Sequence, residues 1–254
     1  LRWAIEKIPG TFNAFQQDAD EATTRVTEAV LPSLFTLDSR GRPHRNPDYL
    51  LSAEVTGREP RQVVVYRINP KAVWTDGRPI TPADFIAQWK ALSGADPSYR
   101  PAGNDGYRQI QKVERGSTRG EVKVTFSRPF ADWRMLFTPL YPKSATGTAE
   151  AFNEDTRGRL PATAGPFRMA AVDRRGSDRF VLLVRNSRWW GKRAVLDRIV
   201  LTQVPHGRRV AALRANAVDV AAIEPAASAV RTAASVPGFT VRKGFDAAFT
   251  QLTL

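Results

Sequence analysis

The chain has 254 residues, of which 42% are hydrophobic and 25% charged, a composition typical of one or two globular domains. No apolar stretch approaches the roughly 18 residues that a membrane span needs. Cysteine is absent, which excludes disulfides, thiol nucleophiles and thiolate metal sites. The formal net charge of +13 indicates attraction to anionic surfaces. Because the arginines are scattered singly or in short runs, the pattern argues against nucleic acid and leaves acidic envelope polymers or anionic lipid headgroups open.

The N-terminal region predicts a strand, a helix and a turn. Residues 1–5 alternate as a strand does, and residues 9–13 are typical of a loop. The polar segment 16–27 has helical character. An apolar run at 30–35 then leads into a turn at 38–41.

In the middle region, the clearest signal is a helix start. Thr81 is a suitable N-cap, Pro82 suits the first helical position, and Asp84 lies near the positive end of the helix dipole. Apolar residues follow at spacings of four and three, and Gly94 ends the helix.

Strands and a turn surround this helix. Residues 61–68 form a β-branched strand, residues 74–77 a tight turn, and residues 121–126 a cleanly alternating strand. Residues 141–164 are rich in Pro, Ser, Thr, Gly and Ala and are predicted to form a long connection.

The C-terminal region is dense in predicted strands, with two short helices between them. The strands are expected at 167–172, 180–184, 199–204, 218–223, 239–241 and 249–254, and the helices at 208–214 and 226–234. This order predicts a mixed or parallel sheet with helix cover. Because a strand pattern at the very end would leave an edge that needs a partner, we expect more protein to follow.

No motif indicates catalysis or a resident metal. The two histidines, His44 and His206, lie in loops without a partner nearby in the sequence, and no phosphate-binding glycine loop is present. The acidic residues have structural assignments in turns, caps or strand flanks, although a carboxylate pair formed in space stays open. The six tryptophans are predicted mainly to pack in the core, and the alternative that one or two of them line a ligand pocket stays open. We therefore expect no enzyme, no catalytic residue and no cofactor.

Residues 64–85 carry a more specific signal: a strand, a Trp-Thr-Asp-Gly turn and a capped helix. This stretch resembles the signature of family 5 extracellular solute-binding proteins, the oligopeptide, dipeptide and nickel receptors of ABC importers. Further segments at 164–168, 183–200 and 211–221 resemble later motifs of the family in the right order.

The resemblance implies an α/β fold of the periplasmic-binding-protein type (type II). Residues 1–45 and 165–254 would form the first lobe around a mixed β-sheet, and residues 46–164 an inserted α+β subdomain. Family members are about twice as long, so the chain would be an N-terminal part that lacks the second lobe. The implied function is capture of a peptide or peptide-like ligand in a cleft between the lobes, outside the cytoplasm, with ABC permease subunits as partners.

The resemblance is closer to an actinobacterial branch of the family, because of residues 84–94, Gly106-Tyr107 and 131–133. That branch includes a lipoprotein associated with envelope lipoglycan synthesis. It implies a membrane-anchored lipoprotein and leaves a second function open, in which an anionic envelope glycolipid is bound without transport. Where the family usually has Leu-Phe-Glu-Gly-Leu, residues 30–35 read Val-Leu-Pro-Ser-Leu-Phe, so the acid is missing.

The residues expected to border the cleft come from four short segments. They are Phe12, Asn13, Pro32, Ser33, Tyr107, Gly165 and Pro166. Each of them has an alternative assignment as a turn or core residue. Neither the identity of the ligand nor the oligomeric state follows from the sequence.

Overall fold

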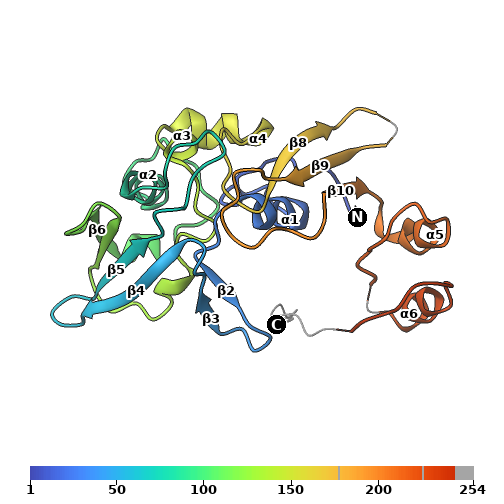
Figure 1. Cartoon of the computed structure of the whole chain (residues 1–254), viewed down its shortest axis with the longest axis horizontal. Helices are drawn as coiled ribbons and strands as arrows, with labels where there is room; N and C mark the ends of the chain where they lie inside the picture. The colour runs from blue at the N-terminus through green and yellow to red at the C-terminus, as the bar shows by residue number, and fades with distance from the viewer. Residues whose placement is uncertain (177, 225, 244–254) are drawn as a thin grey trace, which may run out of the picture.

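The computed structural model describes residues 1–176, 178–224 and 226–243 and contains two four-stranded sheets (Figure 1). The first sheet has the order β1-β10-β9-β8, with β1 at Arg2–Ile5, β8 at Phe167–Asp173, β9 at Phe180–Arg185 and β10 at Arg198–Gln203. β1 runs parallel to β10, and the other neighbours are antiparallel. The predicted mixed sheet is therefore confirmed.

The second sheet is entirely antiparallel and has the order β4-β5-β7-β6. Its strands are β4 at Leu50–Gly57, β5 at Val63–Ile68, β6 at Ile110–Arg115 and β7 at Glu121–Phe126. Along β7, Val122, Val124 and Phe126 are fully buried and alternate with half-buried residues, as the sequence predicts. β4 and β6 were not predicted.

Helix α2, Pro82–Leu92, covers the second sheet, and Phe85 packs against Tyr66 of β5 with ring centroids 5.9 Å apart. The predicted start is confirmed, because Thr81 is the N-cap and Asp84 accepts a hydrogen bond from Thr81 N at 2.8 Å. The other oxygen of Asp84 accepts from Lys143 N at 2.8 Å. Burial raises the pKa of this carboxyl, while the hydrogen bonds favour its charged form.

Helix α1 covers Glu21–Val30 and so begins and ends later than the predicted 16–27. Asp20 caps it by accepting from Thr23 N at 2.9 Å. Gln16 lies in a turn, where its side-chain amide donates to the carbonyl oxygens of Phe152 and Asn153. That tertiary contact keeps residues 16–19 out of the helix.

The predicted turn at 38–41 connects two short strands that were not predicted, β2 at Phe35–Leu37 and β3 at Pro43–Arg45. The predicted connection at 141–164 contains three short helical segments, α3 at Lys143–Thr146, η3 at Ala151–Asp155 and α4 at Thr156–Gly158. Three single turns of 3₁₀-helix lie at η1 (Tyr107–Gln109), η2 (Trp133–Met135) and η4 (His206–Arg208).

At the C-terminal end, the two predicted helices are confirmed as α5, Arg209–Arg214, and α6, Ala227–Ala234. The strand predicted at 218–223 is wrong. Only Val220 forms a bridge, parallel to Trp3, and Ala222 O accepts from the Arg209 side chain instead of a strand neighbour. The strand predicted at 239–241 is absent, and the one at 249–254 lies outside the described residues.

One hydrophobic cluster extends through both sheets and includes Phe12, Tyr66, Trp74 and Leu183. The first sheet is built from residues of the predicted first lobe, and the second sheet from residues of the predicted insert. Because the core is continuous across them, the division at 45/46 and 164/165 stays a prediction. None of the described helices is both long enough and apolar enough to cross a bilayer.

Candidate functional site

Gly165, one of the predicted site residues, lies where the chain at residues 164–166 approaches the end of α1 at Val30; we call this close approach the crossing. The amides of Ala164 and Gly165 both donate to Val30 O, at 2.9 and 2.8 Å. A Cβ added at Gly165 would lie 2.5 Å from Ala29 O and 2.8 Å from two backbone carbons of Val30. Only glycine allows this approach.

Asn186 and Tyr49 hold the 164–166 segment of the crossing by hydrogen bonds. Asn186 donates from Nδ2 to Gly165 O at 2.8 Å and from its backbone to Pro166 O at 2.9 Å. The Tyr49 hydroxyl donates to Ala164 O at 3.0 Å. Two side chains from other parts of the chain therefore hold this segment.

Pro32 is buried, and its carbonyl accepts from Leu140 N at 2.9 Å. Proline lacks an amide proton, so at this position only the carbonyl can take part in backbone pairing. Ser33 is half-buried, and its carbonyl accepts from Asn46 Nδ2 at 3.0 Å. This segment therefore packs on both neighbouring loops through its carbonyl groups.

Phe12 and Asn13 are buried rather than open to solvent. Phe12 is 0% exposed, and its carbonyl accepts from the Tyr141 hydroxyl at 2.8 Å. Asn13 Nδ2 donates to Phe152 O at 2.9 Å, and Asn13 Oδ1 accepts from Phe15 N. These contacts connect the first loop to the helical segment near residue 152.

Tyr107 is 5% exposed, and its hydroxyl accepts from Phe137 N at 2.8 Å and from Gln88 Nε2 at 3.0 Å. Its ring contacts Phe15 edge to face at 6.2 Å, and Phe15 in turn contacts Tyr141. Burial raises the pKa of the Tyr107 hydroxyl to about 12. The hydroxyl therefore stays neutral and serves as a buried acceptor.

Removing this hydroxyl is expected to destabilise the protein. Tyr107→Phe leaves the Phe137 amide without an acceptor and the Gln88 side-chain amide with only Pro139 O, at a cost of about 1–2 kcal/mol in the free energy of unfolding at neutral pH. Because the pKa of the hydroxyl is raised in the folded state, its contribution to the free energy of unfolding is complete below about pH 10. This contribution is lost as the pH rises through about 12. Urea titrations at several pH values should show the difference from wild type shrink at high pH.

The matched control is Tyr99→Phe, because Tyr99 is half-buried and makes one hydrogen bond of 3.3 Å to Thr146 O. Its effect at neutral pH should be smaller. Equal effects of the two substitutions would contradict the role assigned to the Tyr107 hydroxyl.

Most of the predicted site residues have buried side chains. Ser33 and Pro166 are the two that are half-buried, while Phe12, Asn13, Pro32, Tyr107 and Gly165 are buried. Sequence reasoning missed Tyr49, Tyr141 and Asn186 as the partners that hold these segments. The only available signal was the Arg-Asn-Ser-Arg-Trp-Trp motif that contains Asn186.

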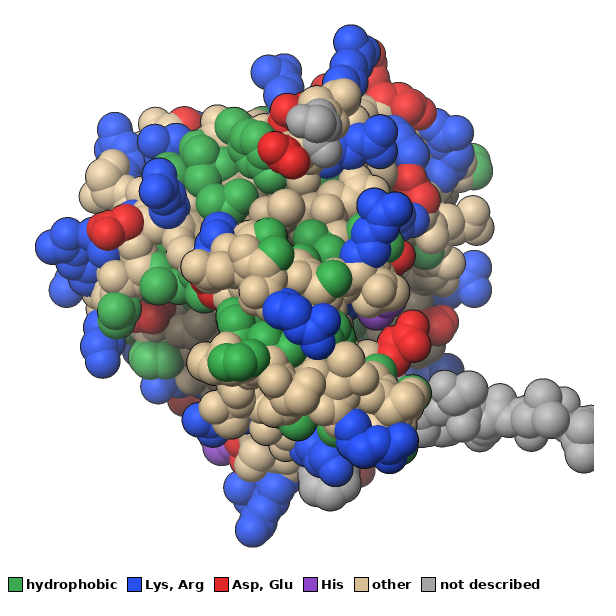
Figure 2. Space-filling view, turned by 90° about the vertical axis from the view of Figure 1, so that its right-hand side faces the viewer, with side chains coloured by type: hydrophobic (Ala, Val, Ile, Leu, Met, Phe, Trp, Pro, Cys, Tyr) green, Lys and Arg blue, Asp and Glu red, His purple; other side chains and the backbone are tan. Residues whose placement is uncertain are grey.

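Charge on the surface is dispersed. Figure 2 shows one face of the molecule, where the described Lys and Arg side chains lie among acidic and neutral ones without forming one continuous patch. Several arginines are paired locally, for example Arg78 with Asp76 and Arg185 with Asp197. Among the residues that the structure describes, no group of three or more His, Cys, Asp or Glu side chains could hold a metal ion.

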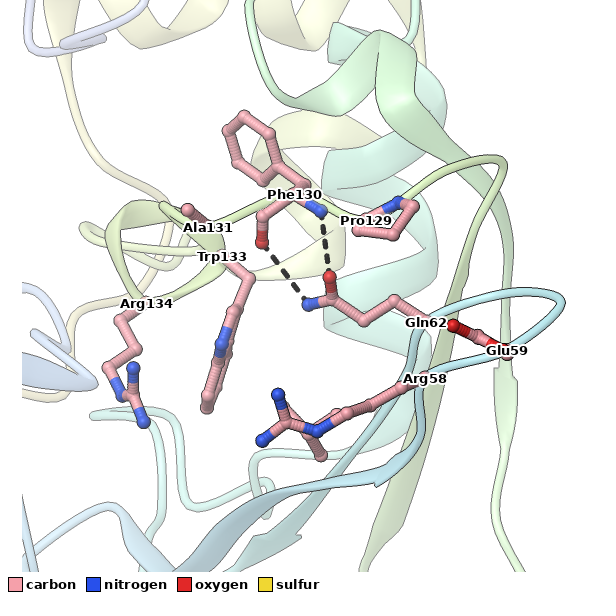
Figure 3. A pocket seen from close by; sticks show the side chains of 9 residues that line it. Arg58, Glu59, Gln62, Pro129, Phe130, Ala131, Trp133 and Arg134 are labelled. Carbon is pink, nitrogen blue, oxygen red and sulfur yellow. Dashed lines mark hydrogen bonds between the residues drawn. The ribbon is translucent and has the colours of Figure 1, made fainter.

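Of two open pockets, the first lies away from the crossing and the second lies beside it, at Asn186. One, of about 480 Å³, lies between the β4–β5 turn and the loop around Trp133 (Figure 3). The other, of about 400 Å³, lies beside Asn186, Trp189 and Arg193.

Comparison with known proteins decides the family. Residues 49–252 match the model of bacterial extracellular solute-binding proteins, family 5, middle region. The chain belongs to this family. Since the family is defined by solute binding, the expectation that the chain is not an enzyme agrees with it.

Curated relatives support this assignment. The oligopeptide-binding protein OppA of Mycobacterium tuberculosis is 35% identical over an alignment of 258 positions, which covers 100% of this chain and 43% of that protein. The probable monoacyl phosphatidylinositol tetramannoside-binding protein LpqW of the same species is 31% identical over 190 residues, which cover 72% of this chain and 29% of LpqW. The chain therefore spans less than half the length of these relatives.

Solved structures confirm the periplasmic-binding-protein fold. The periplasmic EDTA-binding protein EppA superposes with a TM-score of 0.86 at 30% identity, over 93% of this chain and 45% of that chain. The oligopeptide-binding protein AppA from Bacillus subtilis, in complex with a nonapeptide, superposes with a TM-score of 0.80 at 17% identity, over 93% and 46% of the two chains. The second likeness shows the fold alone.

Proposed function

We propose that the whole protein captures a peptide or peptide-like ligand outside the cytoplasm and delivers it to the permease subunits of an ABC importer. The observation that carries this proposal is the 35% identity to an oligopeptide-binding protein across the whole chain. The present residues would supply the first lobe and its insert, and hinge closure onto a second lobe would enclose the ligand. A lipid anchor at the membrane would keep the receptor near its permease.

The crossing provides a preorganised wall for such a cleft. Its backbone is held by Asn186, Tyr49 and the amides of 164 and 165, so little ordering would be needed when a ligand binds. Of the residues proposed to border the cleft, Ser33 and Pro166 have the side chains that reach solvent. Phe12, Asn13, Pro32, Tyr107 and Gly165 would support that wall from within.

A second candidate is binding of an anionic envelope glycolipid without transport. The similarity to LpqW over 72% of the chain favours it, and so does the net charge of +13. The dispersed arrangement of the basic residues would give general attraction to an anionic surface rather than a specific site.

Native mass spectrometry of the whole protein, purified under mild conditions, separates these functions. A heterogeneous ladder of short peptides, released on denaturation, is expected for an import receptor. A lipid or glycan species would favour the second candidate. A protein that is empty and does not respond to peptide libraries in a thermal-shift screen would contradict the peptide proposal.

The position of the cleft is tested by Ser33→Trp. A bulky ring at a half-buried position of the wall should reduce peptide affinity tenfold or more, by occupying space that the ligand needs. Ser39→Trp, at an exposed position of the β2–β3 turn, is the matched control and should leave affinity unchanged. Isothermal titration with a peptide identified by the mass spectrometry measures both. Equal affinities of the two variants would place the cleft elsewhere.

A further inference from the structure

The pocket of about 480 Å³ lies outside the crossing and contains none of the residues proposed for the cleft. Its walls come from the end of β4, the β4–β5 turn, and the loop that precedes and includes η2 (Figure 3). The residues that matter are Val55, Arg58, Gln62, Phe130, Trp133 and Arg134. A volume of this size suits a small organic ligand.

The walls of the pocket are held in place. Gln62, which is 7% exposed, accepts from Phe130 N at 2.7 Å and donates to Phe130 O at 3.2 Å, as the dashed lines in Figure 3 show. Trp133 is 3% exposed and contacts Phe35 and Tyr66 edge to face, with centroids 5.7 and 5.9 Å apart. Neither wall therefore needs to be ordered by a ligand.

Two guanidinium groups, those of Arg58 and Arg134, line this pocket. Arg134 stacks on Trp133, with its Cζ 4.4 Å from the ring centroid, and Figure 3 shows the Arg58 guanidinium on the other side of that ring in the view. Among the described residues, neither arginine has a carboxylate within salt-bridge distance. Glu59 also lines the pocket, but Figure 3 shows it away from Trp133, toward the turn.

We propose that this pocket binds a small monocarboxylate with an apolar body. The carboxylate would lie between Arg58 and Arg134, because a guanidinium group matches a carboxylate with two parallel hydrogen bonds. The apolar body would contact Val55, Phe130 and the accessible edge of Trp133. With one carboxylate and two guanidinium groups in its lining, the pocket has a formal charge of +1, which favours a monoanion over a dianion.

The proposal is tested with phenylacetate as the probe, titrated calorimetrically into the whole protein at low ionic strength. Phenylacetamide, which has the same shape without the charge, should bind at least tenfold more weakly. Arg58→Gln together with Arg134→Gln should weaken phenylacetate binding at least tenfold. Arg61→Gln is the matched control, since Arg61 is exposed near the same turn but does not line the pocket. This variant should bind phenylacetate as wild type does.

Arg134 covers part of Trp133, so its replacement in the double variant also changes the packing of that ring. The single variant Arg58→Gln is therefore measured as well. It removes an exposed side chain that has no hydrogen-bond partner among the described residues. A threefold or larger loss of affinity in this single variant, at an unchanged thermal midpoint, supports the site. Absence of phenylacetate binding at millimolar concentration, equal binding of the amide, or unchanged binding in the double variant would overturn it. The peptides found by native mass spectrometry should be the same in all variants, which keeps this test separate from that of the proposed function.

Discussion

Gly165→Ala is expected to lower the free energy of unfolding of the whole protein by about 2–3 kcal/mol. The added methyl group would overlap Ala29 O and two backbone carbons of Val30. These atoms belong to the main chain, so they cannot rotate away as a side chain would. The two backbone segments therefore have to move apart, which weakens the hydrogen bonds from the amides of Ala164 and Gly165 to Val30 O. Urea unfolding followed by tryptophan fluorescence measures the change.

Gly158→Ala is the matched control. Gly158 lies in α4, has no atom within 4 Å of an added Cβ, and does not have a positive φ angle. Its replacement should change stability by no more than about 0.5 kcal/mol, or increase it slightly by restricting the unfolded chain. If both variants unfold at the same urea concentration, the close approach at Gly165 does not constrain the fold.

Arg209→Met is expected to cost about 3 kcal/mol, because it removes a buried guanidinium with three partners. The Arg209 side chain is 0% exposed and donates to Val204 O at 3.1 Å, to Ala222 O at 2.9 Å and to Glu6 at 3.4 Å. Glu6 is half-exposed, so the ion pair contributes less than the two carbonyl contacts. These contacts join the end of β10 and the start of α5 to the segment that lies beside β1.

Two further substitutions test this assignment. Arg208→Met changes an exposed neighbour and should leave stability within about 0.5 kcal/mol of wild type. Arg209→Lys keeps the charge but cannot reach several acceptors from one planar group, so an intermediate loss is expected. An unfolding midpoint of Arg209→Met that equals that of Arg208→Met would show that the buried network does not stabilise this end of the fold.

The elements that the sequence predicted correctly have strong local signals. The Thr81-Pro82 start of α2 depends on a cap and on a fixed proline φ angle, which neighbouring residues determine. In β7, apolar and polar residues alternate without a break, because one face of the strand is buried and the other is not. β4 and β6 were missed because register shifts, between Leu50 and Ser52 and between Ile110 and Lys112, disrupt the period of two.

The strand expected at 218–223 shows the opposite error. Its first residues, Val-Asp-Val, alternate between apolar and polar as in a strand, but the Arg209 guanidinium donates a hydrogen bond to the Ala222 carbonyl, which a neighbouring strand would otherwise use. Nothing in the local sequence distinguishes this arginine from the exposed ones, because its burial depends on Glu6 and Ala222, which come from other parts of the chain.

The sequence by itself determined the family, the mixed character of the first sheet and the absence of thiol chemistry, since these depend on ordered motifs, on element order and on composition. Only the tertiary structure decided which candidate residues reach solvent. Ser33 does so, whereas Phe12 and Tyr107 pack against segments more than 25 residues away in sequence, in contacts with Tyr141 and Phe137. The pocket lined by Arg58 and Arg134 could not be predicted from the sequence either. Exposed arginines have no periodic signal, and Arg58 and Arg134 line the same pocket only because a turn and a loop 76 positions apart fold together.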